Sequence, residues 1–119
     1  MTSASGAPRP TLQVLKVLRL LLDHPTAAHY GLDLSKQAGL PTGTIYPILT
    51  RLEQAGWVIS AWEDNDPSQV GRPRRRLYWL TQGGAEQAST TLDESRQAIS
   101  SARNPLSGRP KPGPAGAPA

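Results

Sequence analysis

Four arginines lie within the segment GRPRRR, residues 71–76: Arg72, Arg74, Arg75 and Arg76. Gly71 frees the backbone at the tip of a loop and Pro73 stiffens it, so the four side chains point in several directions. Like charges this close repel one another, and an anionic partner removes that cost. Arginine at a loop tip suits the narrow, negative minor groove of DNA or the phosphates beside it. The segment therefore predicts a DNA contact, and the alternative is a charged loop that only keeps the chain soluble.

An acidic run precedes the arginines in the same loop. It consists of Glu63, Asp64 and Asp66, and its spacing does not match a calcium-binding loop. We expect a solvated turn that pairs with the nearby arginines rather than a metal site.

A second polar surface is expected on a helix that starts near Thr42 or Thr44 and ends at Ala55. Pro47 is tolerated only near a first turn, which favours the later start. One face of this helix is apolar, with Ile45, Ile48, Leu49 and Leu52 at positions i, i+3, i+4 and i+7. The opposite face and the helix start carry the candidate DNA-reading side chains: Thr42, Thr44, Tyr46, Thr50, Arg51 and Gln54. Such a surface suits the major groove, where Arg51 would contact a guanine edge or a phosphate, although any solvated helix face looks similar.

The elements around these surfaces follow the order of a winged helix. Residues 11–23 and 31–38 form helices, with Thr11 as an N-cap and Gly39 as a left-handed C-cap. Residues 57–62 and 77–80 form an antiparallel hairpin, and the loop between them carries the arginines. A last helix runs from Thr81 to about residue 101. The fold class is mainly α with a small β-hairpin, a winged helix-turn-helix followed by a C-terminal helix.

The first helix is apolar almost all round, which indicates that a partner subunit covers part of it. The last helix carries only a thin stripe of small side chains with Leu92 and Ile99, so it buries little area. A homodimer is expected, and its candidate interface combines both helices: Leu15, Leu18, Leu22, Leu92 and Ile99. The alternative is a central helix covered within one chain.

Composition narrows the class of protein. The chain has 119 residues, a formal net charge of +4 and no cysteine, which allows one domain and excludes disulfides and thiolate metal sites. Residues 1–10 and 104–119 are rich in proline and small residues and are expected to be disordered. Without a signal sequence or a long apolar run, a cytoplasmic location is expected. His24 and His29 lack a catalytic or metal-binding context, so we expect no enzyme, no cofactor and no metal.

Residues 30–58, YGLDLSKQAGLPTGTIYPILTRLEQAGWV, and residues 71–84, GRPRRRLYWLTQGG, resemble the PadR family of bacterial transcriptional regulators. The resemblance covers about residues 11–103. It implies a winged helix domain over residues 11–80 and a dimerisation helix over residues 81–103. It also implies pseudo-palindromic operators, usually repression, and DNA contacts from Tyr46, its helix neighbours and the wing arginines.

Some members of the family are released from DNA by small aromatic molecules bound near the dimer interface, so a small-molecule effector is a further expected partner. The last helix of this chain has no aromatic residue that would stack on such a molecule, which argues against a pocket of that kind. Trp57, Trp62 and Trp79 lie on the predicted hairpin and are interpreted as packing residues. The alternative function is a winged helix that binds an acidic protein, and such a module would ignore duplex DNA even at low salt.

Overall fold

The computed structural model describes residues 7–103, and the fold is mainly helical with a small antiparallel sheet, as predicted. The expected disorder of the two ends concerns mostly residues 1–6 and 104–119, which lie outside the described residues. The elements in chain order are α1 (Leu12–Asp23), β1 (His29–Tyr30), α2 (Gly31–Ala38), α3 (Thr42–Gln54), β2 (Val58–Trp62), α4 (Pro67–Val70), β3 (Arg76–Leu80) and α5 (Gln82–Arg103). No helix in the described range is long and apolar enough to span a membrane.

Local capping chemistry sets the ends of α1 and α2 as the sequence predicts. The side chain of Thr11 accepts a hydrogen bond from the backbone N–H of Val14, which satisfies one of the free donors at the start of α1. Gly39 adopts φ 68° and ψ 30°, a left-handed conformation that ends α2 and that glycine adopts without a steric cost.

α3 starts at the earlier of the two predicted positions and not at the later one, which was favoured. The helix begins at Thr42, so Pro47 lies inside it rather than in its first turn. Pro47 has no N–H to donate to the carbonyl of Gly43, and this loss is tolerated because both residues are exposed to solvent. Tertiary packing outweighs the local cost, since the apolar face of α3 is fully committed to the core: Ile45, Ile48, Leu49 and Leu52.

The sheet has three strands in the order β1-β3-β2, all antiparallel. The hairpin of β2 and β3 was expected, whereas β1 was not. β1 is only two residues long, and its pairs His29–Tyr78 and Tyr30–Leu77 join residues that no periodicity links. The short helix α4 was also missed. Asp66 caps it by accepting a hydrogen bond from the backbone N–H of Ser68.

The start of α5 packs closely against the beginning of the hairpin. Thr81 caps the helix, because its hydroxyl accepts from the N–H of Gly84 and donates to the carbonyl of Gly56, both at 2.8 Å. A Cβ on Gly84 would lie 1.9 Å from the carbonyl oxygen of Trp57. Gly84, which weakens a helix by its propensity, is therefore required by the close approach of α5 to the hairpin.

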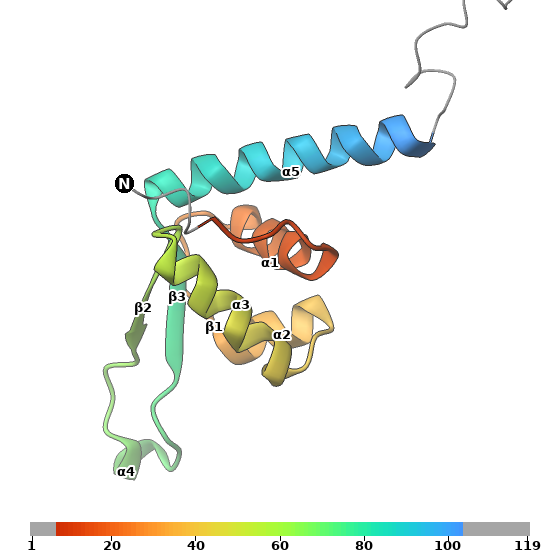
Figure 1. Ribbon diagram of the computed structural model, residues 1–119. Helices are drawn as coiled ribbons and strands as arrows, with labels where there is room; N and C mark the ends of the chain where they lie inside the picture. Colours follow the sequence, from red (N-terminus) through yellow and green to blue (C-terminus); the bar gives the residue numbers. More distant parts are fainter. Residues whose placement is uncertain (1–6, 104–119) are drawn as a thin grey trace, which may run out of the picture.

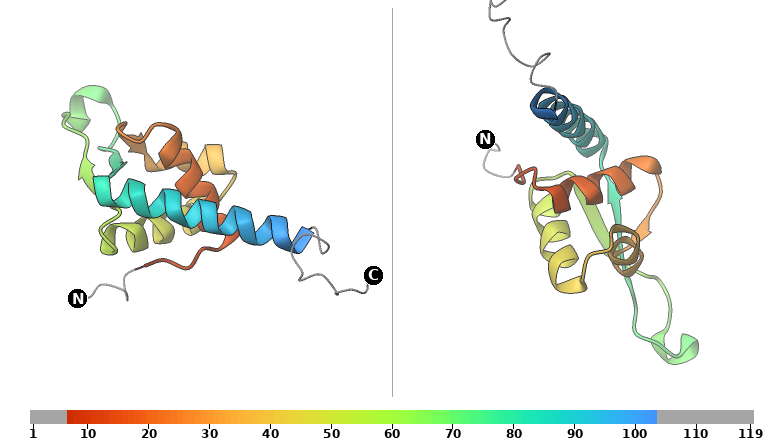
Figure 2. Two further views of the ribbon diagram at one scale, coloured as in Figure 1. Left: turned by 90° about the horizontal axis from the view of Figure 1, so that it is seen from above. Right: turned by 90° about the vertical axis from the view of Figure 1, so that its right-hand side faces the viewer.

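The two ends of the domain carry different features. In Figure 1 and in the right-hand view of Figure 2, α5 lies at one end and the tip of the hairpin, with α4, projects at the other. α1 packs against α5, and the side chains beyond Leu92 are mostly exposed. Leu18 was expected at a dimer interface. It is 0% exposed within the single chain, because α1 points it into the domain's own core, and it therefore offers no surface to a partner.

Candidate nucleic-acid interface

The hairpin of β2 and β3, with the loop between them, forms a wing, defined here as residues 58–80. Trp62 lies directly opposite Arg76 in the strand pairing, and Ser60 lies opposite Tyr78. Directly opposite residues of an antiparallel pair share one face of the sheet. The Arg76 guanidinium stacks 5.0 Å from the centre of the Trp62 ring and donates a hydrogen bond of 2.8 Å to the hydroxyl of Ser60.

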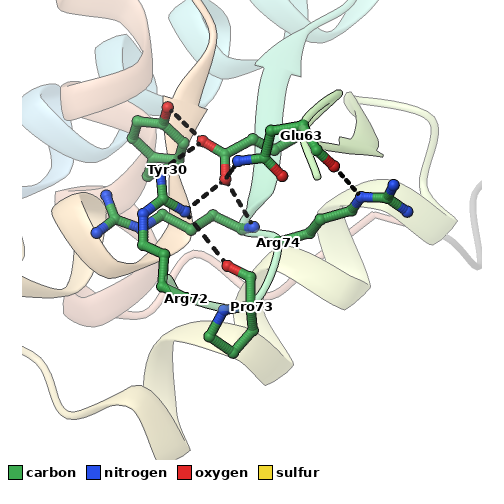
Figure 3. Close-up of polar contacts among 7 residues, drawn as sticks. Tyr30, Glu63, Arg72, Pro73 and Arg74 are labelled. Atoms are coloured by element: carbon green, nitrogen blue, oxygen red, sulfur yellow. Dashed lines mark hydrogen bonds and ion pairs between the residues drawn. The ribbon is translucent and has the colours of Figure 1, made fainter. Parts of the chain in front are cut away.

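Glu63 holds the loop of the wing together, as Figure 3 shows. Its carboxylate accepts two hydrogen bonds from Arg72, at 2.6 and 3.1 Å, and one of 2.9 Å from the hydroxyl of Tyr30. The backbone N–H of Arg75 and the side-chain amide of Asn65 also donate to it, at 3.1 and 3.0 Å. Five donors therefore converge on one carboxylate, and they tie the wing to the start of α2 through Tyr30.

These contacts change the acid–base behaviour of the cluster. The hydrogen bond from Arg72 is the largest effect that lowers the pKa of Glu63, to about 2, from an ordinary 4.5. The hydrogen bond to Glu63 raises the pKa of Tyr30 above its ordinary value. Glu63 is thus ionised at neutral pH and neutralises the charge of Arg72. The prediction that the acidic run pairs with the arginines is confirmed for Glu63.

Carboxylates neutralise the other three arginines of the wing less than they neutralise Arg72. Arg74 donates through Nε to the backbone carbonyl of Asn65 at 2.7 Å, and the Arg75 guanidinium lies 5.3 Å from the centre of the Tyr30 ring. Neither forms an ion pair with any residue between 7 and 103. Arg76 has a distant carboxylate, Glu53, at 3.9 Å, and the pair is about one-third exposed on both sides. Exposed pairs of this kind contribute little free energy.

The polar surface of α3 is only partly open to solvent. Four of the six candidate side chains are exposed: Thr42, Thr50, Arg51 and Gln54. Thr44 and Tyr46 are half-buried. The ring of Tyr46 lies 6.5 Å from that of Tyr78 and fills the space where a Cβ on Gly31 would stand, 2.6 Å from the ring. Tyr46 therefore fastens α3 to α2 and to the sheet, and only part of it faces outward.

A hollow of about 480 Å³ lies between the helices and the wing, and we call it the wing hollow. Leu32 of α2 and Tyr46 of α3 line it from the helices, Tyr30 lines it from β1, and Trp62 and the arginines of residues 72–76 line it from the wing. It brings Tyr46 together with all four arginines. The other candidates on α3 do not line it: Thr42, Thr44, Thr50, Arg51 and Gln54.

Sequence reasoning missed two contributors to this region. Tyr30 contributes through its hydrogen bond to Glu63. It was missed because Glu63 lies 33 positions away in the sequence. Trp62 was interpreted as a packing residue, yet it is 59% exposed, whereas Trp57 is 7% exposed and belongs to the core. One feature of the sequence could have indicated this for Trp62. It is the last residue of β2, beyond the part of the strand that packs on the core. Among residues 7–103, no group of histidine and acidic side chains is placed to hold a metal ion.

Comparisons with known proteins agree with this geometry. The chain matches the transcriptional regulator PadR-like family over residues 17–90. Smu.1704 from Streptococcus mutans UA159 is similar in structure, with 26% identity, a TM-score of 0.62, and coverage of 82% of this chain and 92% of that one. NadR, solved in complex with 4-hydroxyphenylacetate, shows 31% identity and a TM-score of 0.53 over 82% of this chain and 65% of its own.

A transcriptional regulator homologue from Pyrococcus horikoshii OT3 shares the fold, with 21% identity and a TM-score of 0.59 over 73% of this chain and 79% of that one. No curated protein matches the sequence. The family match spans more than half of the chain, and the winged helix fold agrees with it. The chain belongs to the PadR-like family of transcriptional regulators.

Proposed function

We propose that two copies of this chain bind a pseudo-palindromic DNA operator and repress transcription. One observation carries the proposal: Tyr46 of α3 and the arginines of the wing border the same hollow, so a helix and a charged hairpin face one side of the molecule. This combination suits adjacent grooves of a DNA duplex, because a helix fits the major groove and a thin ribbon fits the backbone or groove beside it.

Each surface then has a distinct role. The exposed polar side chains of α3 approach base edges and phosphates in the major groove, with Arg51 as the strongest donor. Arg74 and Arg75, which have no ion pair within residues 7–103, contact the phosphates or the minor groove. Arg72 contributes mainly through Glu63, by keeping the wing in position.

The dimer is proposed to form through α1 and α5, with residues 81–103 as the dimerisation helix. Leu12 and Ile99 are 67% and 51% exposed, and Leu15, Leu22 and Leu92 are partly exposed on the same two helices. A groove between the helices has an apolar floor and a polar border, and its lining consists of Leu12, Leu15, Leu92 and Ile99 together with Lys16, Arg19, Ser95 and Arg96. Burial of this surface against a second copy would remove apolar area from water. The surface lies far from the tip of the wing (Figure 1).

Nuclease protection of the upstream DNA, with the full chain, tests this function. We expect a protected region of two half-sites about one helical turn apart. Arg75→Ala should weaken binding to the protected sequence, while Arg9→Ala, which removes the same charge from an exposed residue before α1, should leave it near wild type. A chain that ignores duplex DNA at low salt would refute the proposal and favour a protein-binding winged helix.

A further inference from the structure

Two residues of α3 are poor helix formers that the packing of the domain does not require. Pro47 lies in the middle of the helix, and Gly43 lies one turn before it. Proline and glycine are the two residue types that destabilise a helix most. A Cβ added to Gly43 would meet no atom of the rest of the domain within 4 Å, so no close approach calls for glycine there. Both residues are exposed to solvent, so the core does not explain them either.

Pro47 leaves the backbone carbonyl of Gly43 without its helical donor. In an α-helix this carbonyl accepts from the N–H four residues later, and proline has none. The neighbouring N–H groups, those of Tyr46 and Ile48, serve other carbonyls in the same pattern. No side chain of residues 7–103 donates to the Gly43 carbonyl. The proline ring also pushes this carbonyl outward, so an acceptor that the described chain leaves unpaired faces the solvent.

This acceptor lies on the surface that the proposed function gives to the major groove. The exposed residues opposite the buried face of α3 recur at helical spacing: Gly43, Pro47, Thr50 and Gln54. Because Gly43 has no side chain, nothing of its own stands between its backbone and a surface laid against the helix. A helix that enters the major groove with this face brings the Gly43 carbonyl to the edges of the bases.

The chemistry of the major groove decides what such an acceptor binds. The only donors there are the exocyclic amino groups, N4 of cytosine and N6 of adenine, whereas guanine presents acceptors and thymine presents an acceptor and a methyl group. We propose that the Gly43 carbonyl accepts a hydrogen bond from the amino group of one base in each half-site. The contact selects a base pair that presents its amino group at that point. It rests on the proposed function, because it requires α3 in the major groove.

The test is a thermodynamic cycle with the full chain and the duplex that it protects from nuclease. Each adenine is replaced in turn by purine and each cytosine by 2-pyrimidinone, at matching positions of both half-sites, because these analogues lack only the amino group. One net hydrogen bond corresponds to about three- to tenfold in affinity, so its loss from both half-sites should weaken wild-type binding about ten- to a hundredfold. The analogue that causes the loss shows whether adenine or cytosine is the donor.

Pro47→Ala assigns the loss to the Gly43 carbonyl. The substitution restores the missing N–H, which then occupies that carbonyl within the helix. The variant should bind the unmodified operator about ten- to a hundredfold more weakly than wild type, and removal of the amino group should cost it nothing more. The weakening of the base pair by the analogue cancels in the cycle, because both proteins meet the same duplexes. Thermal melts should show Pro47→Ala to be at least as stable as wild type, which separates weaker binding from unfolding.

Two further variants serve as a control and as a second test. Thr50→Ala removes side-chain atoms from the same face and should keep the full wild-type sensitivity to the amino group. Gly43→Ala should fold as wild type does, since its Cβ meets open space, but its methyl group would stand between the carbonyl and the bases. Its operator binding should fall by about tenfold or more. Non-specific binding at low salt should stay within about twofold of wild type for Gly43→Ala and Pro47→Ala, because it depends on the arginines.

The outcomes distinguish this contact from the proposed function. Equal sensitivity of wild type and Pro47→Ala to every amino substitution overturns the contact and leaves the proposed function in place. Operator binding by Pro47→Ala at wild-type affinity does the same. A chain that binds no duplex at all overturns both.

Discussion

Replacing Glu63 by glutamine should make DNA binding more sensitive to salt. Glu63 neutralises Arg72 through two hydrogen bonds of 2.6 and 3.1 Å, so the wild-type wing offers Arg74, Arg75 and Arg76 to phosphates. The Glu63→Gln variant removes the negative charge and leaves the Arg72 guanidinium free to contact a phosphate of its own. The variant should therefore neutralise one more phosphate per chain.

Counterion release gives the magnitude. Each neutralised phosphate contributes a slope of about −0.9 to the plot of log K against log salt concentration. Three arginines per chain give about −2.7, or about −5.4 for a dimer, and a fourth gives about −3.6 and about −7.2. Between 50 and 200 mM salt, the wild-type dimer should lose roughly 2,000-fold in affinity and the variant roughly 20,000-fold.

Fluorescence anisotropy of a labelled operator duplex over a salt series measures both slopes at pH 7. Asp64→Asn is the matched control, because it makes the same change of formal charge one position further along. Asp64 is exposed and forms no ion pair with a residue between 7 and 103, so its variant should keep the wild-type slope. Equal slopes for the two variants would refute the conclusion that Glu63 holds one arginine away from DNA.

Three further outcomes follow from the contacts. Gly84→Ala should destabilise the fold by about 3 kcal/mol or more in thermal melts, because its Cβ would meet the Trp57 carbonyl at 1.9 Å, while Gly83→Ala has open space and should not. Since the folded pKa of Glu63 is about 2 and the ordinary value is 4.5, its contribution to stability is complete above pH 4.5 and disappears as pH falls through about 2. Denaturant midpoints measured across that window should fall more for the wild type than for Glu63→Gln, and parallel curves would contradict the cluster. Ile99→Glu should yield monomers in light scattering, whereas Ser100→Glu at the next exposed position should not; an Ile99→Glu dimer would rule out α5 as the interface.

Much of the fold could be predicted because its signals are local. The side chain of Thr11 caps the start of α1, and the backbone conformation of Gly39 ends α2. The apolar residues of α3 repeat at helical spacing. For the same reason the later of the two predicted starts of α3 was favoured, and that preference is wrong. Pro47 is a strong local signal, and the four buried side chains that overrule it act through the tertiary structure.

The sequence shows the arginines of the candidate site, but it does not show which of them is paired with a carboxylate and which is not. A cluster of four like charges gives no sign that Arg72 is paired while Arg75 is stacked on Tyr30. That distinction depends on β1, two residues whose pairing brings Tyr30 beside the wing. A strand this short has no pattern of its own, so the tertiary fold alone decides which charges remain free.

Glu63 explains how a loop so rich in arginine can keep one shape without a bound anion. Four guanidinium groups without a counterion would push the loop apart, and a mobile wing would lose entropy on binding. One partly buried carboxylate removes a quarter of that charge and fastens the loop to Tyr30. The remaining charge is then presented from a fixed position beside Tyr46.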